Sequence, residues 1–415
     1  MLKLLTIVVI FASSSAQALS LPEAVSLALQ NSNTIKQSEY DLQRADLSVT
    51  QNRAAFLPSL DLTADYSYNQ ASPKTRQYEW DSAAALVLSE NLYDHGVSIL
   101  NFQASKDRRT LAQLDYQREK SSTILRTARL YFDVLKSLAI EDLQNKNTLQ
   151  VEKVYKLISS QYRQGMRTRQ DYLRFESQFQ RSLISQTSAQ LDSVRAKEDL
   201  KSFLSLREAP MVYENYRVRP PIPSASELYE VARKRLRLSV RESEEGLAKV
   251  ENRPKIDLVA KLGYGSDSYY QNAGSWNDND QTFLTAGVVF RWNLWDWGQR
   301  ASVVKSERFL TLKTESETSQ EERDALAAIV KLEQALKTIQ LQYEITEKLL
   351  KVEQENYNAT ERDLRQGQNN YLTYSTSLSD LISSQIQNIQ TEYNLILARL
   401  DLGHRKGYLD ESIIK

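Results

Sequence analysis

A six-residue motif occurs twice in the chain, as NLYDHG at residues 91–96 and as NLWDWG at residues 293–298. The two copies are 202 residues apart, about half of the 415-residue length. A second pair of matches precedes them, because PSLDLTADYSY begins at Pro58 and PKIDLVAKLGY begins at Pro254. Such ordered repetition predicts that the chain is built from two copies of one structural unit.

Glycine and proline mark the helices of each copy. The tripeptide RQG recurs at 163–165 and 365–367, and each time its glycine stands 69 residues after the glycine of the hexapeptide. This glycine is the only Gly or Pro in a stretch of about a hundred residues rich in Leu, Gln, Glu, Lys and Arg, which predicts helix. Expected helices are 97–163, 167–206, 299–365 and 369–403. A helix of that length rises to ~100 Å and belongs in a bundle or coiled coil.

The segments between the helices alternate between apolar and polar residues, as β-strands do. Leu60, Leu62 and Ala64 share one face, and Asp61 and Thr63 share the other. Expected strands are 59–69, 82–92, 255–265 and 282–294, each about as long as a tilted transmembrane strand. A soluble sandwich would show the same alternation. All five tryptophans fall in or beside these strands, which favours the membrane interpretation because Trp gathers at membrane interfaces.

Strand–helix junctions explain the repeated hexapeptide. An aspartate can cap the first helical turn, a glycine can adopt backbone angles barred to other residues, and a proline can end the preceding helix. The junction residues are Pro58, Asp94, Gly96, Pro254, Asp296 and Gly298. The aromatic residues expected at the membrane interface are Tyr93, Trp292, Trp295 and Trp297.

Composition excludes several functions. The formal net charge is zero, which gives no attraction to nucleic acid, and there is no cysteine and only two histidines. We therefore expect no metal site, no cofactor and no enzyme activity. Residues 1–18 have a lysine, a short apolar run and an Ala-Gln-Ala end, which predicts a signal peptide.

Four strands cannot close a barrel, and open sheet edges are not tolerated in lipid. Three copies would supply twelve strands, enough for a water-filled lumen, whereas two would supply eight. The expected fold is mainly α with a β-barrel portion: a duplicated helix-strand-strand-long helix-helix unit, forming a homotrimer with a 12-stranded β-barrel above a long α-helical barrel. The alternative is an exported coiled-coil scaffold of the cell envelope without transport activity.

The sequence resembles the TolC-like outer membrane efflux proteins, from LPEAVSLALQNS at Leu21 to RLDLGHRKG ending at Gly407. The resemblance rests on NRAAFLPSLDL, the paired hexapeptides, the paired RQG turns and GMRTRQDYL. It implies an outer membrane protein that extends into the periplasm and contacts outer membrane lipid. It would be the exit duct of a tripartite efflux pump or a type I secretion system, with a periplasmic membrane-fusion adaptor and an inner membrane pump as partners.

The resemblance also assigns regions and site residues. It divides the mature chain into a first repeat (19–206), an equatorial linker (207–225), a second repeat (226–403) and a tail (404–415) that joins the equatorial girdle. The adaptor-docking tip would comprise Arg163, Gln164, Gly165, Met166, Arg365, Gln366, Gly367 and Gln368. The gate would comprise Asp171, with Thr373 and Thr376 at positions where relatives often carry aspartate. The other interpretation of Asp171 is a solvated acid on a helix surface.

Overall fold

The computed structural model describes residues 19–71, 77–208, 210–212, 229–251, 253–265, 281–365 and 371–406. The expected signal peptide lies outside these residues. So do the tip residues Gln366, Gly367 and Gln368, most of the expected linker and most of the tail.

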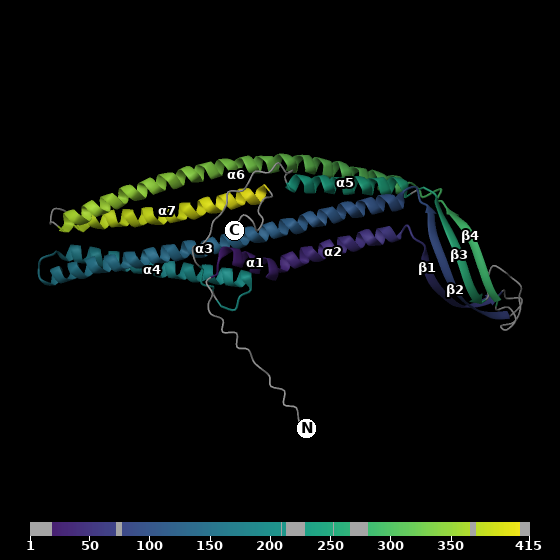
Figure 1. The fold of residues 1–415 in the computed structure, drawn as a ribbon, viewed down its shortest axis with the longest axis horizontal. Helices are drawn as coiled ribbons and strands as arrows, with labels where there is room; N and C mark the ends of the chain where they lie inside the picture. Colours follow the sequence, from purple (N-terminus) through teal and green to yellow (C-terminus); the bar gives the residue numbers. More distant parts are fainter. Residues whose placement is uncertain are drawn as a thin grey trace, which may run out of the picture. The chain divides into compact units, whose positions relative to one another are not determined.

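Seven helices and four strands make up the described chain (Figure 1). The first half contains α1 (Leu21–Asn31), α2 (Asn33–Ala54), β1 (Ser59–Ala71), β2 (Gln77–Tyr93), α3 (Val97–Arg163) and α4 (Arg169–Leu204). The second half contains α5 (Tyr229–Val250), β3 (Lys255–Gly265), β4 (Gln281–Arg291), α6 (Gln299–Arg365) and α7 (Tyr371–Arg405). The expected mainly helical fold with a duplicated helix-strand-strand-helix-helix unit is confirmed. The strand ends differ most: β2 begins earlier than expected, and β4 ends at Arg291 rather than 294.

The chain forms two compact units that alternate along the sequence. The first unit contains residues 1–37, 117–229 and 324–415, and the second contains residues 38–116 and 230–323. Helices α2, α3 and α6 each contribute to both units.

The apolar core of the first unit joins four helices. Its buried members include Leu21, Ala24, Val25 and Ala28 of α1, Ile124, Ala128, Tyr131 and Phe132 of α3, Leu200 and Leu204 of α4, and Tyr393 and Leu400 of α7. Their spacing of three and four residues along α3 places them on one helix face. The hydroxyl of Tyr131 donates a hydrogen bond to the carbonyl oxygen of Leu19 at 3.1 Å. The backbone just before α1 is therefore hydrogen-bonded to α3.

The two long helices differ in how they bury their apolar residues. On α3 the apolar residues Leu125, Ala128, Phe132 and Leu135, which are three or four positions apart, are buried. On α6 an apolar set with similar spacing is less buried: Ala335 and Leu349 are exposed, and Leu332 and Ile339 are half-buried. A large apolar surface of α6 therefore faces out of the chain.

The second unit is built on a four-stranded antiparallel sheet in the order β1-β2-β3-β4. The two hairpins have equivalent registers, because Leu62 lies opposite Leu86 in the first and Leu258 lies opposite Val288 in the second. Strands β2 and β3 pair with each other and join the two halves, and β1 and β4 form the sheet edges (Figure 1).

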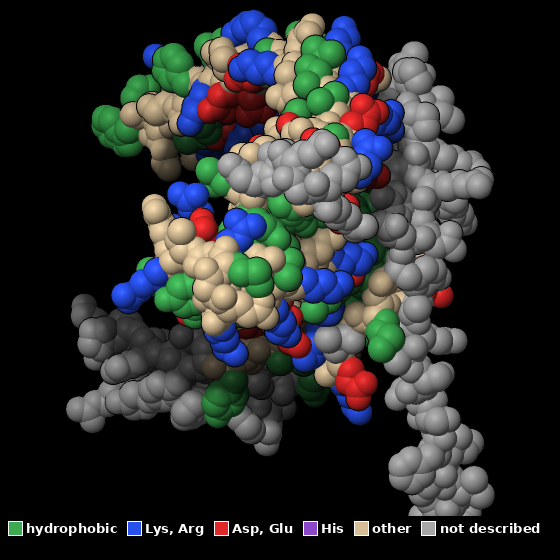
Figure 2. All heavy atoms as spheres, turned by 90° about the vertical axis from the view of Figure 1, so that its left-hand side faces the viewer, with side chains coloured by type: hydrophobic (Ala, Val, Ile, Leu, Met, Phe, Trp, Pro, Cys, Tyr) green, Lys and Arg blue, Asp and Glu red, His purple; other side chains and the backbone are tan. Residues whose placement is uncertain are grey.

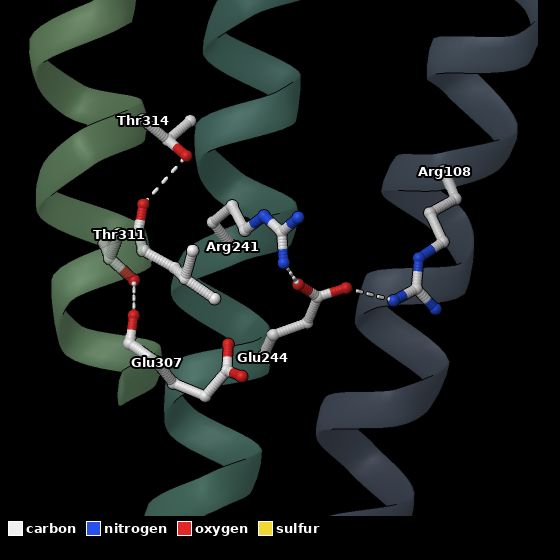
Figure 3. A network of polar contacts seen from close by, with 7 residues as sticks. Arg108, Arg241, Glu244, Glu307, Thr311 and Thr314 are labelled. Atoms are coloured by element: carbon white, nitrogen blue, oxygen red, sulfur yellow. Dashed lines mark hydrogen bonds and ion pairs between the residues drawn. The ribbon is translucent and has the colours of Figure 1, made fainter. Parts of the chain in front are cut away.

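Helix α5 connects α3 and α6 in this unit mainly through charged side chains. The carboxylate of Glu244 accepts from Arg108 of α3 at 2.5 Å and from Arg241 of α5 at 2.6 Å (Figure 3). The neighbouring Glu245 is buried and binds Lys249 at 2.6 Å and Arg308 of α6 at 3.4 Å. Adjacent glutamates thus bind helices on opposite sides of α5.

Candidate functional site

The first strand–helix junction is capped by a buried aspartate. Asp94, which is 8% exposed, follows β2 and precedes α3. Its carboxylate accepts hydrogen bonds from the backbone N–H of Gly96 at 3.0 Å and from the N–H and hydroxyl of Ser98 at 2.8 and 2.5 Å. Burial favours the neutral acid, but the hydrogen bonds from Ser98 and Gly96, helped by the charge of Lys255, outweigh it and lower the pKa of Asp94.

The second junction repeats this cap in a more open setting. The carboxylate of Asp296 accepts from the backbone N–H of Gly298 and of Arg300, both at 3.1 Å. Gly298 has a φ of 83°, and Gly96 of the first junction has a φ of 88°. Both glycines therefore occupy the left-handed region that the sequence predicts.

The residue before each glycine is left-handed as well, which the sequence does not reveal. His95 has a φ of 56° and Trp297 has a φ of 57°. A positive φ is unusual for a bulky side chain and carries a cost of roughly 1–2 kcal/mol. The only sequence signal is that both residues precede a glycine inside a repeated motif.

The two left-handed aromatic residues have different surroundings. His95 Nδ1 donates a hydrogen bond to the carbonyl oxygen of Pro254 at 2.9 Å, and its ring lies 4.5 Å from that of Tyr93. Trp297 is 89% exposed and contacts Trp295 edge-on, with 5.7 Å between ring centroids. Within the described chain, the first junction is thus fastened to the start of β3, and the second presents its indole to solvent.

The other junction residues lie where the sequence places them, and so do the aromatic residues except Trp292. Pro58 directly precedes β1 and Pro254 directly precedes β3. Tyr93 ends β2, whereas Trp292 lies just beyond β4 rather than within it. The side chains of Tyr93, Trp292 and Trp295 are all exposed. Their position at a membrane interface stays a prediction.

The turn between α3 and α4 contains the first set of expected tip residues. Gly165 has a φ of 75°, its N–H donates to the carbonyl of Tyr162 at 3.0 Å, and the N–H of Met166 donates to that of Gln161 at 2.9 Å. This pair of bonds is the Schellman arrangement that ends a helix at a glycine. Arg163, Gln164 and Met166 are exposed at the turn.

Asp171, the expected gate acid, has a local structural role. The hydroxyl of Thr168 accepts from the backbone N–H of Asp171 at 3.1 Å and donates to its carboxylate at 2.9 Å. Thr168 is therefore the N-cap of α4, and the carboxylate at the third position reaches back to it. Asp171 is half-buried rather than a freely solvated acid.

The two threonines expected near the gate lie in the first turns of α7. Both Thr373 and Thr376 have exposed side chains, and the hydroxyl of Thr376 donates to the carbonyl of Leu372 at 3.1 Å. Arg365 is the last residue of α6, and the turn that follows it lies outside the described residues. The structure therefore places these residues without assigning them a gate.

A pair of tyrosines joins the helices next to each turn, and sequence inspection missed it. The hydroxyl oxygens of Tyr155 and Tyr172 are 3.3 Å apart, and those of Tyr357 and Tyr374 are 3.0 Å apart. Each pair keeps the 202-residue offset of the repeat, which was the available signal. The hydrogen bond with Tyr155, together with burial and the charge of a nearby glutamate, raises the pKa of Tyr172 to about 12.

In the first unit, residues at and just before the start of α4 contact the start of α7. The guanidinium of Arg167 lies 4.5 Å from the ring centroid of Tyr371, and Phe175 meets the same ring edge-on at 6.0 Å. The hydroxyl of Ser375 donates to the side-chain oxygen of Gln178 at 2.6 Å. A space-filling view of this end shows many lysine and arginine side chains on its surface (Figure 2). Residues 163–174, which include the α3–α4 turn, contain four arginines and one acid.

Among the described residues, no group of three or more His, Asp or Glu side chains is placed to hold a metal ion. No helix in the described ranges combines the length and apolar character needed to cross a membrane.

Comparison with known proteins identifies relatives over most of the chain. A family model described as outer membrane efflux protein matches residues 24–205 and 229–404. The outer membrane protein TolC of Escherichia coli strain K12 is 23% identical over 318 residues, which cover 72% of this chain and 64% of the relative. TolC of Vibrio cholerae serotype O1 is 22% identical over 308 residues, covering 72% of this chain and 70% of the relative. The chain thus spans less than two thirds of the Escherichia coli relative.

Solved structures share the fold. The Campylobacter jejuni CmeC outer membrane channel superposes with a TM-score of 0.84 at 18% identity, covering 94% of this chain and 87% of that one. CusC, solved in work on folding and transmembrane channel formation, gives 0.80 at 13% identity, with 92% and 91% covered. The Vibrio cholerae outer membrane protein VceC gives 0.78 at 16% identity, with 93% and 96% covered.

Proposed function

The chain belongs to the outer membrane efflux protein family, and we propose that three copies of it assemble into a channel that is the exit duct of a tripartite efflux pump or a type I secretion system. The protein resides in the outer membrane and extends into the periplasm. The observation that carries the proposal is the open four-stranded sheet, which has two unpaired edges and one continuous apolar face.

The apolar face fits contact with lipid. Its exposed members are all even-numbered and share one side of the sheet: Leu60, Leu62, Tyr66, Leu86, Leu88, Leu262, Tyr264, Leu284, Val288 and Phe290. The opposite face carries Asp61, Asp65 and Lys261, which suit an aqueous lumen. A sheet with one lipid-facing side and two open edges requires strands from other copies, since the edges must be paired in lipid.

An experiment on the intact protein tests this function. Purified protein should run as a heat-resistant trimer in detergent gels. After reconstitution into planar bilayers, it should conduct ions. A monodisperse monomer that conducts would contradict the trimeric duct. A detergent-soluble oligomer that neither inserts nor conducts would favour the exported scaffold instead.

The α3–α4 turn is proposed as part of the docking tip for the periplasmic adaptor, with Arg365, Gln366, Gly367 and Gln368 as its counterpart. Support comes from the exposed Arg163, Gln164 and Met166 around Gly165. Charge reversal Arg163→Glu should reduce export in cells while trimer yield stays normal. The matched control is Arg181→Glu, because Arg181 is an exposed arginine too but lies within α4, away from the turn. Equal loss in both variants would remove the tip assignment.

Asp171 is proposed to contribute to the gate, with Thr373 and Thr376 lowering the charge of its second half. The substitution Asp171→Asn removes the charge but keeps an oxygen that can accept from Thr168, so α4 should stay capped. We expect reduced cation preference of the bilayer conductance, and stronger block by divalent cations in Thr373→Asp. Unchanged ion selectivity in Asp171→Asn would confine Asp171 to its capping role.

A further inference from the structure

The sheet repeats itself so regularly that its outer edges can be assigned partners. Residues 59–69 of β1 have equivalents 196 places later in β3, an offset that Pro58 and Pro254 share, and residues 79–89 of β2 have equivalents 202 places later in β4, an offset that Asn91 and Asn293 share. The structure obeys both offsets, because Ser59 opposite Ser89 becomes Lys255 opposite Arg291. The two hairpins are therefore equivalent residue by residue.

The joint between the hairpins gives a template for the joint between copies. In the chain, β2 of the first half lies antiparallel to β3, which begins the second half, with Leu86 opposite Leu262 and Leu88 opposite Ala260. In a closed ring, β4 of one copy must meet β1 of the next, and these strands are the repeat equivalents of β2 and β3. We propose that β4 pairs with β1 of a second copy in the register that places Val288 opposite Tyr66 and Phe290 opposite Ala64, an inference that rests on the proposed trimeric duct.

The end of β4 supports this seam. Strand β4 stops at Arg291, the equivalent of Ser89, which is the position where the β1–β2 pairing also stops. Strand β2 continues beyond that position to Tyr93, because β3 lies alongside and pairs with Asn91. A neighbour at the outer edge of β4 would extend it in the same way, towards the end at 294 that the alternation of the sequence predicts.

Side chains along the two edges are complementary in this register. Arg291 pairs with Asp257 of β3 at 2.8 Å but keeps 72% of its side chain exposed, and it would lie opposite Thr63 and diagonal to Asp61 and Asp65 of the second copy, all on the polar face. Cross-strand pairs of opposite charge stabilise an antiparallel sheet. Val288 would lie opposite Tyr66 on the apolar face, where both are exposed in the single chain. A register shifted by one residue would place Arg291 on the wrong face.

The same equivalence assigns the exposed Trp297 a hydrogen-bond partner in the second copy. Its equivalent, His95, donates from its ring to the carbonyl of Pro254 at the start of β3. The equivalent acceptor for the indole N–H of Trp297 is the carbonyl of Pro58 at the start of β1 in the second copy. This contact would cover an indole that is 89% exposed in the single chain.

Disulfide cross-linking tests the register, because the chain has no cysteine of its own. The double variant Phe290→Cys, Ala64→Cys should form covalent dimers and trimers with a membrane-permeant oxidant. Slipped controls pair Phe290→Cys with Leu62→Cys or with Tyr66→Cys, where the Cα atoms would be about 7–8 Å apart and beyond disulfide reach. The positive control is Leu88→Cys, Ala260→Cys, the equivalent pair inside one chain. We expect at least tenfold more cross-linking in the matched pair than in either slipped pair.

The outcomes separate this inference from the proposed function. Trimer formation and conductance of the cysteine-free protein are measured first, and their absence would overturn both. An intact, conducting trimer that cross-links through a slipped pair, or through none of the three, would overturn the register alone. A second readout is the heat resistance of the trimer, which Trp297→Ala should lower and Trp297→His should retain. Equal heat resistance in both variants would exclude the contact with Pro58.

Discussion

Removing the cap aspartates one at a time should show that the two junctions, though equivalent in sequence, differ in strength. The perturbations are Asp94→Ala and Asp296→Ala. Asp94 is buried and accepts four hydrogen bonds, from Gly96 N–H, from two groups of Ser98 and from the side-chain amide of Asn91. Asp296 accepts from the backbone N–H groups of Gly298 and Arg300, and its side chain is only partly buried, with 20% of it exposed.

The magnitudes follow from burial. Loss of an N-cap costs about 0.5–2 kcal/mol, and a buried N–H left without a partner adds about 1–3 kcal/mol. We therefore expect about 2–4 kcal/mol for Asp94→Ala. For Asp296→Ala water can replace the lost acceptor, so we expect about 1–2 kcal/mol. These free energies correspond to roughly 30- to 700-fold and 5- to 30-fold changes in a local opening equilibrium, since 1.4 kcal/mol is tenfold.

Hydrogen exchange followed by mass spectrometry measures this opening locally, without assuming that the whole chain unfolds in one step. Peptides covering the first turns of α3 and α6 should exchange faster by these factors. The control Asp94→Asn keeps an acceptor oxygen and should lose less protection than Asp94→Ala. Equal acceleration at the two junctions, or none at α3, would refute the argument that burial sets the difference.

The lowered pKa of Asp94 adds a pH signature. A carboxyl group whose pKa is lower in the folded state stabilises the fold above its ordinary pKa, and this stabilisation is lost as the pH falls through the folded-state value. Protection of the first turn of α3 should therefore fall below about pH 4 in the native protein. The Asp94→Ala variant should lack that dependence, and a native protein without it would contradict the assigned hydrogen bonds.

Three further predictions follow from single contacts. Tyr155→Phe should lower the pKa of Tyr172 from about 12 towards the ordinary tyrosine value, which ultraviolet titration would detect. Burial, and then neighbouring arginines, lower the pKa of His404, so exchange protection at the end of α7 should decrease as the pH falls below about 6.5, and His404→Gln should not show this decrease. Gly263→Ala should reduce the yield of folded protein, because a Cβ there would lie 2.4 Å from the Phe283 ring and 2.8 Å from a backbone oxygen of β2; Phe283→Ala should restore only part of the loss.

Much of the fold could be predicted because the repeat and the breakers act locally. The bounds of α3 and α6 follow from the glycine at each end, since a long stretch of good helix formers has no other reason to stop. The cap by Asp94 follows from its place just before the helix. These features depend on residues within a few positions of each other, and sequence reasoning sees such neighbours directly.

Features that depend on distant neighbours could not be predicted. The exposed Ala335 and the buried Ala128 occupy similar helical patterns, and only the positions of other helices decide which is covered. The hydrogen bond between Thr168 and Asp171 is different, because it is local and could be predicted. Its pattern, a threonine followed three residues later by an acid at a helix start, was available in the sequence.

The difference between His95 and Trp297 shows what strand order adds to a repeat. Both residues have the same left-handed backbone and the same place before a glycine, so the sequence treats them as one position. Strand order separates them: β2 has a neighbour on each side, whereas β4 ends the sheet. A contact inside one chain is held by the covalent backbone, so the single hydrogen bond from His95 to Pro254 is enough to fasten it. A contact between separate copies must also offset the loss of their independent motion, and a large buried indole contributes more to that than an imidazole does. The histidine therefore belongs to the joint inside the chain, and the tryptophan belongs to the joint between copies.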